Sequence, residues 1–293
     1  MFGLEATEDP VIVVQPPTQG KANTRTLETK DASGWEMLSD AEYYHKANAS
    51  ADSRGKRLEK RLSATFEALA KEVIQGTKAN RLNLETKREP FNAKKWVEKF
   101  LDATEEERKI IVEKILADAT TEVGENWDEI ESEFGDVRSA GIAESAAKIK
   151  ESVETVHQEM KDLLKAQGNA SAQEIEDAID AKFSTYKGSR SATIARTTVT
   201  ATTGVSQKEA WKQMNESIED PTKKIIRKWV AIPGQTSRHS TMTVNGSYED
   251  ENGLFDVAGE KTAYPAGDGL SADQAVNCKC FTRAIRAGRK PKV

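Results

Sequence analysis

Apolar residues recur at intervals of three and four along most of the chain up to about Asn215, the spacing that lines one face of an α-helix. The first complete stripe of this kind consists of Leu58, Leu62, Phe66, Leu69 and Val73. Gly76 is the expected end of that helix, because glycine often follows the last periodic residue. We therefore expect mainly helical structure from about Trp35 to Asn215.

The most regular stripe alternates steps of four and three over about three heptads. Its members are Ile142, Ala146, Ile149, Val153, Val156, Met160 and Leu163. So narrow a seam predicts a coiled coil or a helical hairpin. We expect its partner within the chain, for example the helix at 58–73, because helix bundles outnumber free zippers at this length.

Capping residues predict where the helices between these stripes begin. We expect one helix at Asn92–Leu101 and a second at Thr104–Ile130. The second helix would begin with a capping box, because Thr104 and Glu107 have the required types and spacing.

The last two expected helices lead into the C-terminal part of the chain. Ala172–Tyr186 follows another capping box, formed by Ser171 and Glu174. Arg190–Asn215 carries a β-branched run that ends at Gly204, and we expect a break or kink there because such residues are stiff in a helix.

Beyond these helices the pattern changes to short β-type segments between turn signals. The segments are Lys228–Ile232, Met242–Val244, Leu254–Val257 and Cys278–Ile285. The pairs Asn245-Gly246 and Asp268-Gly269 are typical of turns. The pattern predicts an α+β fold, in which an elongated, mainly helical N-terminal region precedes a small C-terminal α+β module with a short antiparallel sheet.

Composition favours an elongated molecule over one large globule. Hydrophobic residues make up 37% of the chain and charged residues 31%, so the core is modest and the surface strongly solvated. We expect a flexible arm at 1–33, a helical region at 34–187, a compact module at 188–285 and a basic tail at 286–293. No apolar run is long enough to span a bilayer, so we expect no membrane partner.

Charge is unevenly distributed. The net charge of −5 argues against a protein that coats DNA over its whole surface. Two stretches nevertheless carry basic residues and no acid: Pro221–Ser240, with Lys223, Lys224, Arg227, Lys228 and Arg238, and the C-terminal stretch from Phe281, with Arg283, Arg286, Arg289, Lys290 and Lys292. A weak, non-specific DNA contact through the tail is one expectation; a solvated basic rim is the other.

The residues with the most chemical potential are His239, Cys278 and Cys280. Two thiolates and an imidazole are zinc ligands, but a closed tetrahedral site needs a fourth, which Asp256 or Asp268 would have to supply. Because that ligand is missing, the sequence favours buried cysteines, a loop-fixing histidine and no metal or cofactor.

Enzymatic alternatives are less well supported. Cys278 and His239 would form a nucleophile pair if they met, and Arg196, His239 and Glu249 would form a nuclease-like set. The chain has no phosphate-binding loop, zinc-protease motif, nucleophile elbow or dinucleotide fingerprint. We therefore expect a protein that is not an enzyme.

Polar residues must help to fix the loops of so short a module, because its core is small. We expect Arg196 to clamp the last helix to loop carbonyls and carboxylates of the β module. It should lie close to His239 and to Asn277–Cys280, with Asn277 bonded to the Arg238–Thr243 loop. Alternation along the C-terminal strand would place both cysteines on its apolar face.

An ordered set of residues in this part of the chain resembles a known family. In sequence order the set is Arg196-Thr197, Trp229, Arg238-His239, Asn245-Gly246, Phe255, Pro265 with Gly267-Asp268, and Asn277-Cys278-Lys279-Cys280. It resembles the phage Mu F-like head morphogenesis (minor capsid protein) family over about a third of the chain, from Ala192 to Ile285. Two positions depart from the family pattern: Pro233–Arg238 replaces an acidic lead to the histidine, and Lys279 stands where arginine is usual.

The resemblance implies a minor head protein of a tailed bacteriophage, assembled in the host cytoplasm and carried in the virion. Its implied partners are the portal protein and other head or scaffold proteins. It would act at or near the portal in procapsid assembly, and in DNA packaging or ejection. The alternative is a phage-encoded enzyme, nuclease-like or transferase-like, carried by the C-terminal module.

Overall fold

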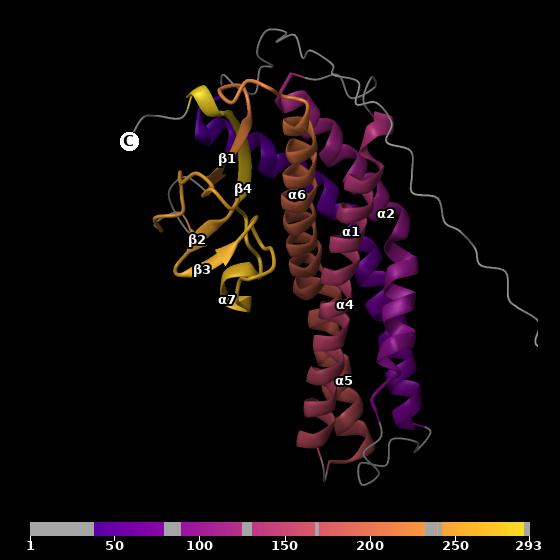
Figure 1. Ribbon diagram of the computed structural model, residues 1–293. Coiled ribbons are helices and arrows are strands. Elements are labelled where there is room, and N and C mark those ends of the chain that lie inside the picture. The colour runs from indigo at the N-terminus through magenta and orange to yellow at the C-terminus, as the bar shows by residue number, and fades with distance from the viewer. Residues whose placement is uncertain are drawn as a thin grey trace, which may run out of the picture.

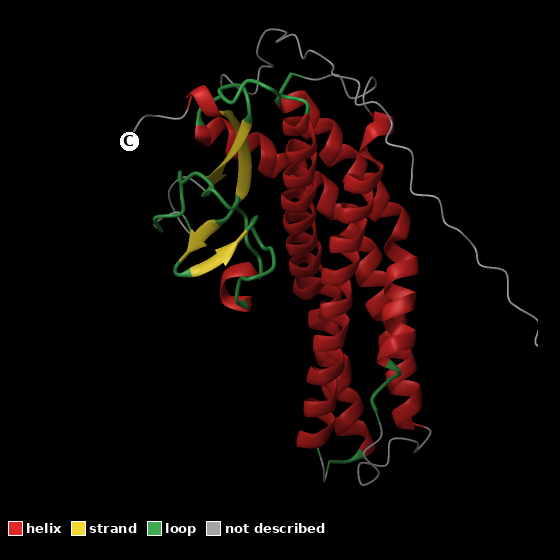
Figure 2. Cartoon of the chain, viewed as in Figure 1, coloured by secondary structure: helices red, strands yellow, loops and turns green. Residues whose placement is uncertain are grey.

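The computed structural model describes residues 38–78, 89–124, 131–167, 170–231, 239 and 242–289. Its long helices are α1 (Asp40–Lys78), α2 (Ala93–Glu122), α4 (Gly135–Ala166), α5 (Ala172–Thr185) and α6 (Ser191–Glu216). Figure 1 shows them as an elongated bundle, with small sheets beside α6 on one side. The α+β prediction is confirmed, with helices followed by antiparallel strands (Figure 2). The expected arm at 1–33 lies outside the described residues.

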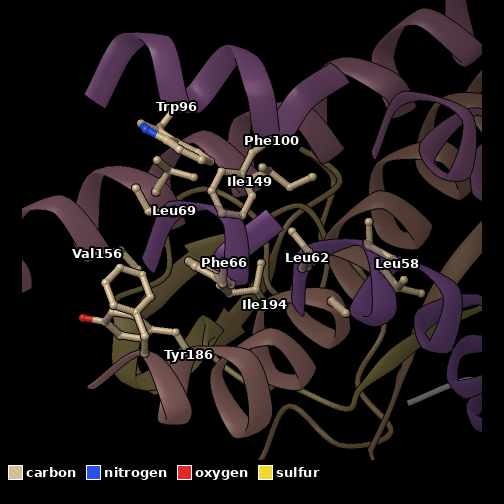
Figure 3. Packing of buried hydrophobic residues seen from close by; sticks show 14 of the residues in the cluster. Leu58, Leu62, Phe66, Leu69, Trp96, Phe100, Ile149, Val156, Tyr186 and Ile194 are labelled. Carbon is tan, nitrogen blue, oxygen red and sulfur yellow. The ribbon is translucent and has the colours of Figure 1, made fainter. Parts of the chain in front are cut away.

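The apolar stripe of α1 forms the centre of the bundle. All five of its predicted members, from Leu58 to Val73, are buried in one cluster with side chains of the other long helices (Figure 3). The Phe66 ring lies 4.7 Å from that of Phe100 on α2 and 5.6 Å from that of Tyr186. The predicted end at Gly76 is wrong, because α1 continues to Lys78. A glycine costs about 1 kcal/mol in a helix and need not end it.

One helix, α2, replaces the two predicted between residues 92 and 130. It begins at Asn92, whose side chain accepts a hydrogen bond from the Lys95 backbone N–H. The predicted capping box at Thr104 is wrong. The Thr104 hydroxyl donates to the Phe100 carbonyl one turn earlier, at 2.7 Å, so it is satisfied within a continuing helix.

Four of the seven residues of the predicted α4 seam are buried, namely Ile149, Val153, Val156 and Met160, and the helix has other neighbours than the expected one. The helix packs mainly against α2 and α6 instead of against the 58–73 stretch. Toward its N-terminal end the buried positions are Val137, Gly141 and Ser145, while Ile142 and Ala146 are only half-buried. A Cβ atom at Gly141 would lie 2.4 Å from Ser206 Oγ on α6 and 3.0 Å from Val112 on α2, so glycine permits this close approach of three helices.

The boundary between the last two helices lies where it was expected, between residues 186 and 190, but the second helix has no break. The capping box at Ser171 and Glu174 is confirmed at the start of α5. A π-helical turn, η3 (Tyr186–Arg190), then joins α5 to α6, with non-helical backbone angles at Gly188. The predicted break at Gly204 is wrong, because α6 runs straight through it. A Cβ atom there would lie 2.5 Å from Tyr264 Cβ, so glycine serves close packing with the module.

Two antiparallel strand pairs form the β part of the molecule. β1 (Ile225–Val230) pairs with β4 (Phe281–Arg286), and β2 (Phe255–Val257) pairs with β3 (Glu260–Thr262). The first pair confirms that the C-terminal strand lies within a small sheet. The strand predicted at Met242–Val244 is wrong, because Val244 lies in a turn. β3 was not predicted, since Glu-Lys-Thr has no apolar alternation.

Buried polar contacts attach the β1–β4 pair to the bundle. The Tyr43 hydroxyl of α1 donates to the Thr282 carbonyl at 2.6 Å. The Ala284 N–H donates to the Glu122 carboxylate of α2 at 2.8 Å. The described part of the chain contains no helix long and apolar enough to cross a membrane.

Candidate functional site

His239, Cys278 and Cys280 form a compact buried cluster. His239 Nδ1 lies 3.2 Å from Cys280 Sγ and 3.6 Å from Cys278 Sγ. One ligand atom from each residue lies within 4.8 Å of the other two. The predicted proximity of His239 to the cysteine segment is therefore confirmed.

The cysteines are held by α6 and by the short helix α7 (Ala272–Ala275), and not by strand pairing. Asn277 has a left-handed backbone, with φ of 55°, a conformation that asparagine tolerates better than most residues. Its N–H donates to Thr197 Oγ1 at 3.0 Å, and Thr200 Oγ1 donates to the Cys278 carbonyl at 3.1 Å. The prediction that the cysteines alternate along a strand is wrong, because β4 begins only at Phe281.

The second ring nitrogen of His239 fixes the orientation of the imidazole. Nε2 lies 2.8 Å from the side-chain amide oxygen of Gln274 on α7. An amide oxygen only accepts hydrogen bonds, so this contact places the ring proton on Nε2 in the neutral histidine. The lone pair on Nδ1 then faces the two sulfurs.

The environment of the cluster favours a thiolate and excludes solvent. The hydrogen bond from Cys280 lowers the pKa of Cys278 to about 5, although burial acts to raise it. Cys278 is 3% exposed, Cys280 0% and His239 1%. Reactive cysteines usually sit in partly exposed sites, so the Cys278–His239 pair is poorly placed to meet a substrate.

The nuclease-like set is not assembled, because its members have other partners. The Arg196 guanidinium pairs with Asp52 and bonds the Asn48 side chain, both on α1. The predicted clamp to the β module is therefore wrong: Arg196 joins α6 to α1. Glu249 instead accepts hydrogen bonds from the backbone and side chain of Arg227.

Several other residues of the predicted set surround the cluster. The Trp229 ring stands edge-on to His239, with centroids 6.0 Å apart, and lies 5.2 Å from the Phe255 ring. Asn245 and Gly246 make the predicted turn beside β1: the Asn245 side chain accepts from Ala231 N–H, and Gly246 has φ of 81°. Arg238 lies outside the described residues.

Gly267 and Asp268 lie away from the cluster, at the contact between the module and α4. A Cβ atom at Gly267 would lie 2.6 Å from the Tyr264 ring, so this position has no room for a side chain. Asp268 lies 3.5 Å from Lys148, and its side chain is 87% exposed. Asp256, the other suggested fourth zinc ligand, accepts from Gly259 N–H and pairs with Lys261. Both aspartates thus have partners outside the cluster.

The sequence did not predict the buried role of Arg227. Its guanidinium is paired with Glu249 and donates to the carbonyls of Gly253 and Ala263, tying β1 to two loops. Part of the expected basic surface is therefore internal. Lys228 pairs with Asp40, and Arg286 donates to the Val123 carbonyl. The sequence indicated this role for Arg227 only weakly, through a positive charge close to apolar residues in a short strand.

Comparison of the chain with protein-family models, curated proteins and solved structures finds no match. The functional argument therefore rests on the residues themselves. Two observations carry it: several residues of the ordered set are buried together around Trp229, and the strands β1 and β4 contact the helical bundle.

Proposed function

We propose that this chain is a minor head protein of a tailed bacteriophage, acting at or near the portal during procapsid assembly and in DNA packaging or ejection. The observation that carries the proposal is the convergence of residues from the resembling set. Trp229, Phe255, Cys278 and Cys280 are separated in sequence but belong to one buried cluster.

The arrangement of the helices supports a role in binding other proteins. The long bundle carries the small sheets beside α6 (Figure 1), and an elongated bundle offers a long surface to partner proteins. The proposed partners are the portal protein and other head or scaffold proteins. A virion location follows from the same proposal.

The burial of the Cys–His cluster favours this role over the enzyme alternative. A nucleophile must reach its substrate, and the two sulfurs are almost completely covered. The proposal includes a weak, non-specific DNA contact through the basic tail. Arg283, in β4 just before the tail, is paired with Asp40, so fewer cations of the C-terminal basic stretch are left to meet phosphate.

A complementation experiment tests the proposed function. The coding sequence is deleted from the phage or prophage genome that carries it, and variants are supplied in trans. Wild type, Trp229→Phe and the exposed variant Lys150→Ala should restore infectious, DNA-filled particles. Trp229→Ala should fail, because it removes the largest side chain of the module core. Normal yields of infectious particles without the chain would overturn the proposal.

A further inference from the structure

We propose that His239, Cys278 and Cys280 bind a zinc ion through Nδ1 and the two thiolate sulfurs. The three residues come from different local segments, yet their ligand atoms face one another in the same buried space. This assignment does not depend on the proposed role in the phage head. It replaces the metal-free arrangement that the sequence favoured.

The two nitrogen–sulfur separations are close to those of a tetrahedral zinc site. With Zn–N of about 2.05 Å and Zn–S of about 2.3 Å, a tetrahedral angle places nitrogen and sulfur about 3.5 Å apart. The observed distances from His239 Nδ1 are 3.2 Å and 3.6 Å. Each nitrogen–sulfur distance is therefore within a few tenths of an ångström of the tetrahedral value.

The contact between His239 and Gln274 supplies the support that metal-binding histidines usually have. A ligating imidazole typically donates its second N–H to a fixed oxygen, which sets the tautomer and the ring orientation. Nε2 of His239 makes such a contact at 2.8 Å with Gln274 Oε1. The other nitrogen is thereby kept available as a ligand.

Charge balance explains why a metal suits this cluster. Thiolates in an apolar core are costly when uncompensated, and the surrounding cluster is formed by side chains such as Trp229, Val257 and Phe255. A zinc ion cancels the charge of two thiolates, while the imidazole stays neutral. Soft sulfur ligands also favour zinc over magnesium or calcium. These three residues supply three of the four ligands of a tetrahedral ion, and the described residues offer no fourth within the same cluster.

Metal content of the purified chain tests the assignment. The full chain is purified under reducing conditions without chelators or metal-affinity resin, and zinc is measured by atomic spectrometry. We expect about one zinc per chain. Cys278→Ser, Cys280→Ser and His239→Gln should each lose it. His45→Gln, which changes an exposed histidine on α1, should retain it.

Cobalt substitution gives a second readout that needs no variant. Co²⁺ added anaerobically to the reduced, zinc-depleted chain should produce visible d–d bands and a near-ultraviolet thiolate charge-transfer band, and zinc should abolish both. Loss of folded structure on chelation, restored by zinc, would also support the site. The proposal is overturned if the reduced chain takes up neither metal, if Cys280→Ser binds as well as wild type, or if the cysteines form a disulfide that reduction does not convert into a metal-binding site.

Discussion

Asp40 and Arg283, which are 243 residues apart, form an ion pair with 3.0 Å between Oδ1 and Nη1. The other carboxylate oxygen of Asp40 pairs with Lys228. One residue in the first turn of α1 therefore holds both strands of the β1–β4 pair. A negative charge at this end of a helix is also favoured by the helix dipole.

Replacing Asp40 with asparagine should loosen this attachment. We expect a loss of about 1–3 kcal/mol in the free energy of unfolding, because the Arg283 side chain is only 7% exposed and loses its charged partner. Urea unfolding followed by circular dichroism provides the measurement. Glu67→Gln, which breaks an exposed pair with Lys71 on the same helix, should change stability by less than about 0.5 kcal/mol. Equal effects of the two substitutions would contradict the anchoring role.

Two helical glycines should respond to alanine in opposite directions. Gly204→Ala should destabilise by about 1–3 kcal/mol, because the new methyl group meets Tyr264 Cβ. Gly55→Ala should stabilise by about 0.5–1 kcal/mol, because nothing lies within 4 Å of a Cβ atom there. Thermal melting of both variants checks the pair. Stabilisation by Gly204→Ala would show that α6 and the segment around Tyr264 are not packed this closely.

The seam of α4 should not tolerate a charge. Val153 is 1% exposed, so Val153→Asp should cost roughly 3 kcal/mol or more by burying an unpaired carboxylate. Thr155→Asp places the same group on the exposed face of the helix and should have little effect. Unchanged melting of Val153→Asp would refute burial of the seam.

Glu122 should make stability depend on pH. Burial raises its pKa to about 8 from 4.5, against the opposing effects of the Ala284 N–H and the Tyr43 hydroxyl. Its contribution is fully present below pH about 4.5, where both states are protonated, and is lost as pH rises through about 8. Over this window stability should fall by up to about 1.4 kcal/mol per pH unit.

Glu122→Gln provides the comparison for this pH effect. The neutral variant should lack this fall. Its stability relative to wild type should therefore increase as the pH rises from about 5 to about 8. Glu105→Gln, on the exposed face of the same helix, serves as the control. Parallel pH profiles for wild type and Glu122→Gln would contradict the assignment.

Periodicity predicted the buried faces better than the helix ends or the partners. The stripe from Leu58 to Val73 was identified correctly because burial on a helix repeats every three to four residues. The predicted helix start at Thr104 was wrong because a threonine with a glutamate three residues later can also lie inside a helix. The Thr104 hydroxyl then donates to a carbonyl one turn earlier. The partner of α4 depends on contacts between distant segments, which the local pattern does not contain.

The sequence predicted which residues form the candidate site better than it predicted their contacts. His239 and the cysteines were named from sequence, and they meet. Arg196 was assigned to the module because its charge needs partners, but sequence does not reveal that Asp52 lies opposite it. Gln274 was missed, because one glutamine in a short polar stretch carries no signal until the fold brings it to the imidazole.

Quantitative mass spectrometry of purified phage heads tests the proposed function most directly. Peptides of this chain are counted against those of the portal protein and the major capsid protein, in heads separated from free protein on a density gradient. A minor head protein predicts that the chain is present in every preparation, at a few copies per particle and in a fixed ratio to the portal. Its absence from heads that contain portal and capsid protein would contradict the account.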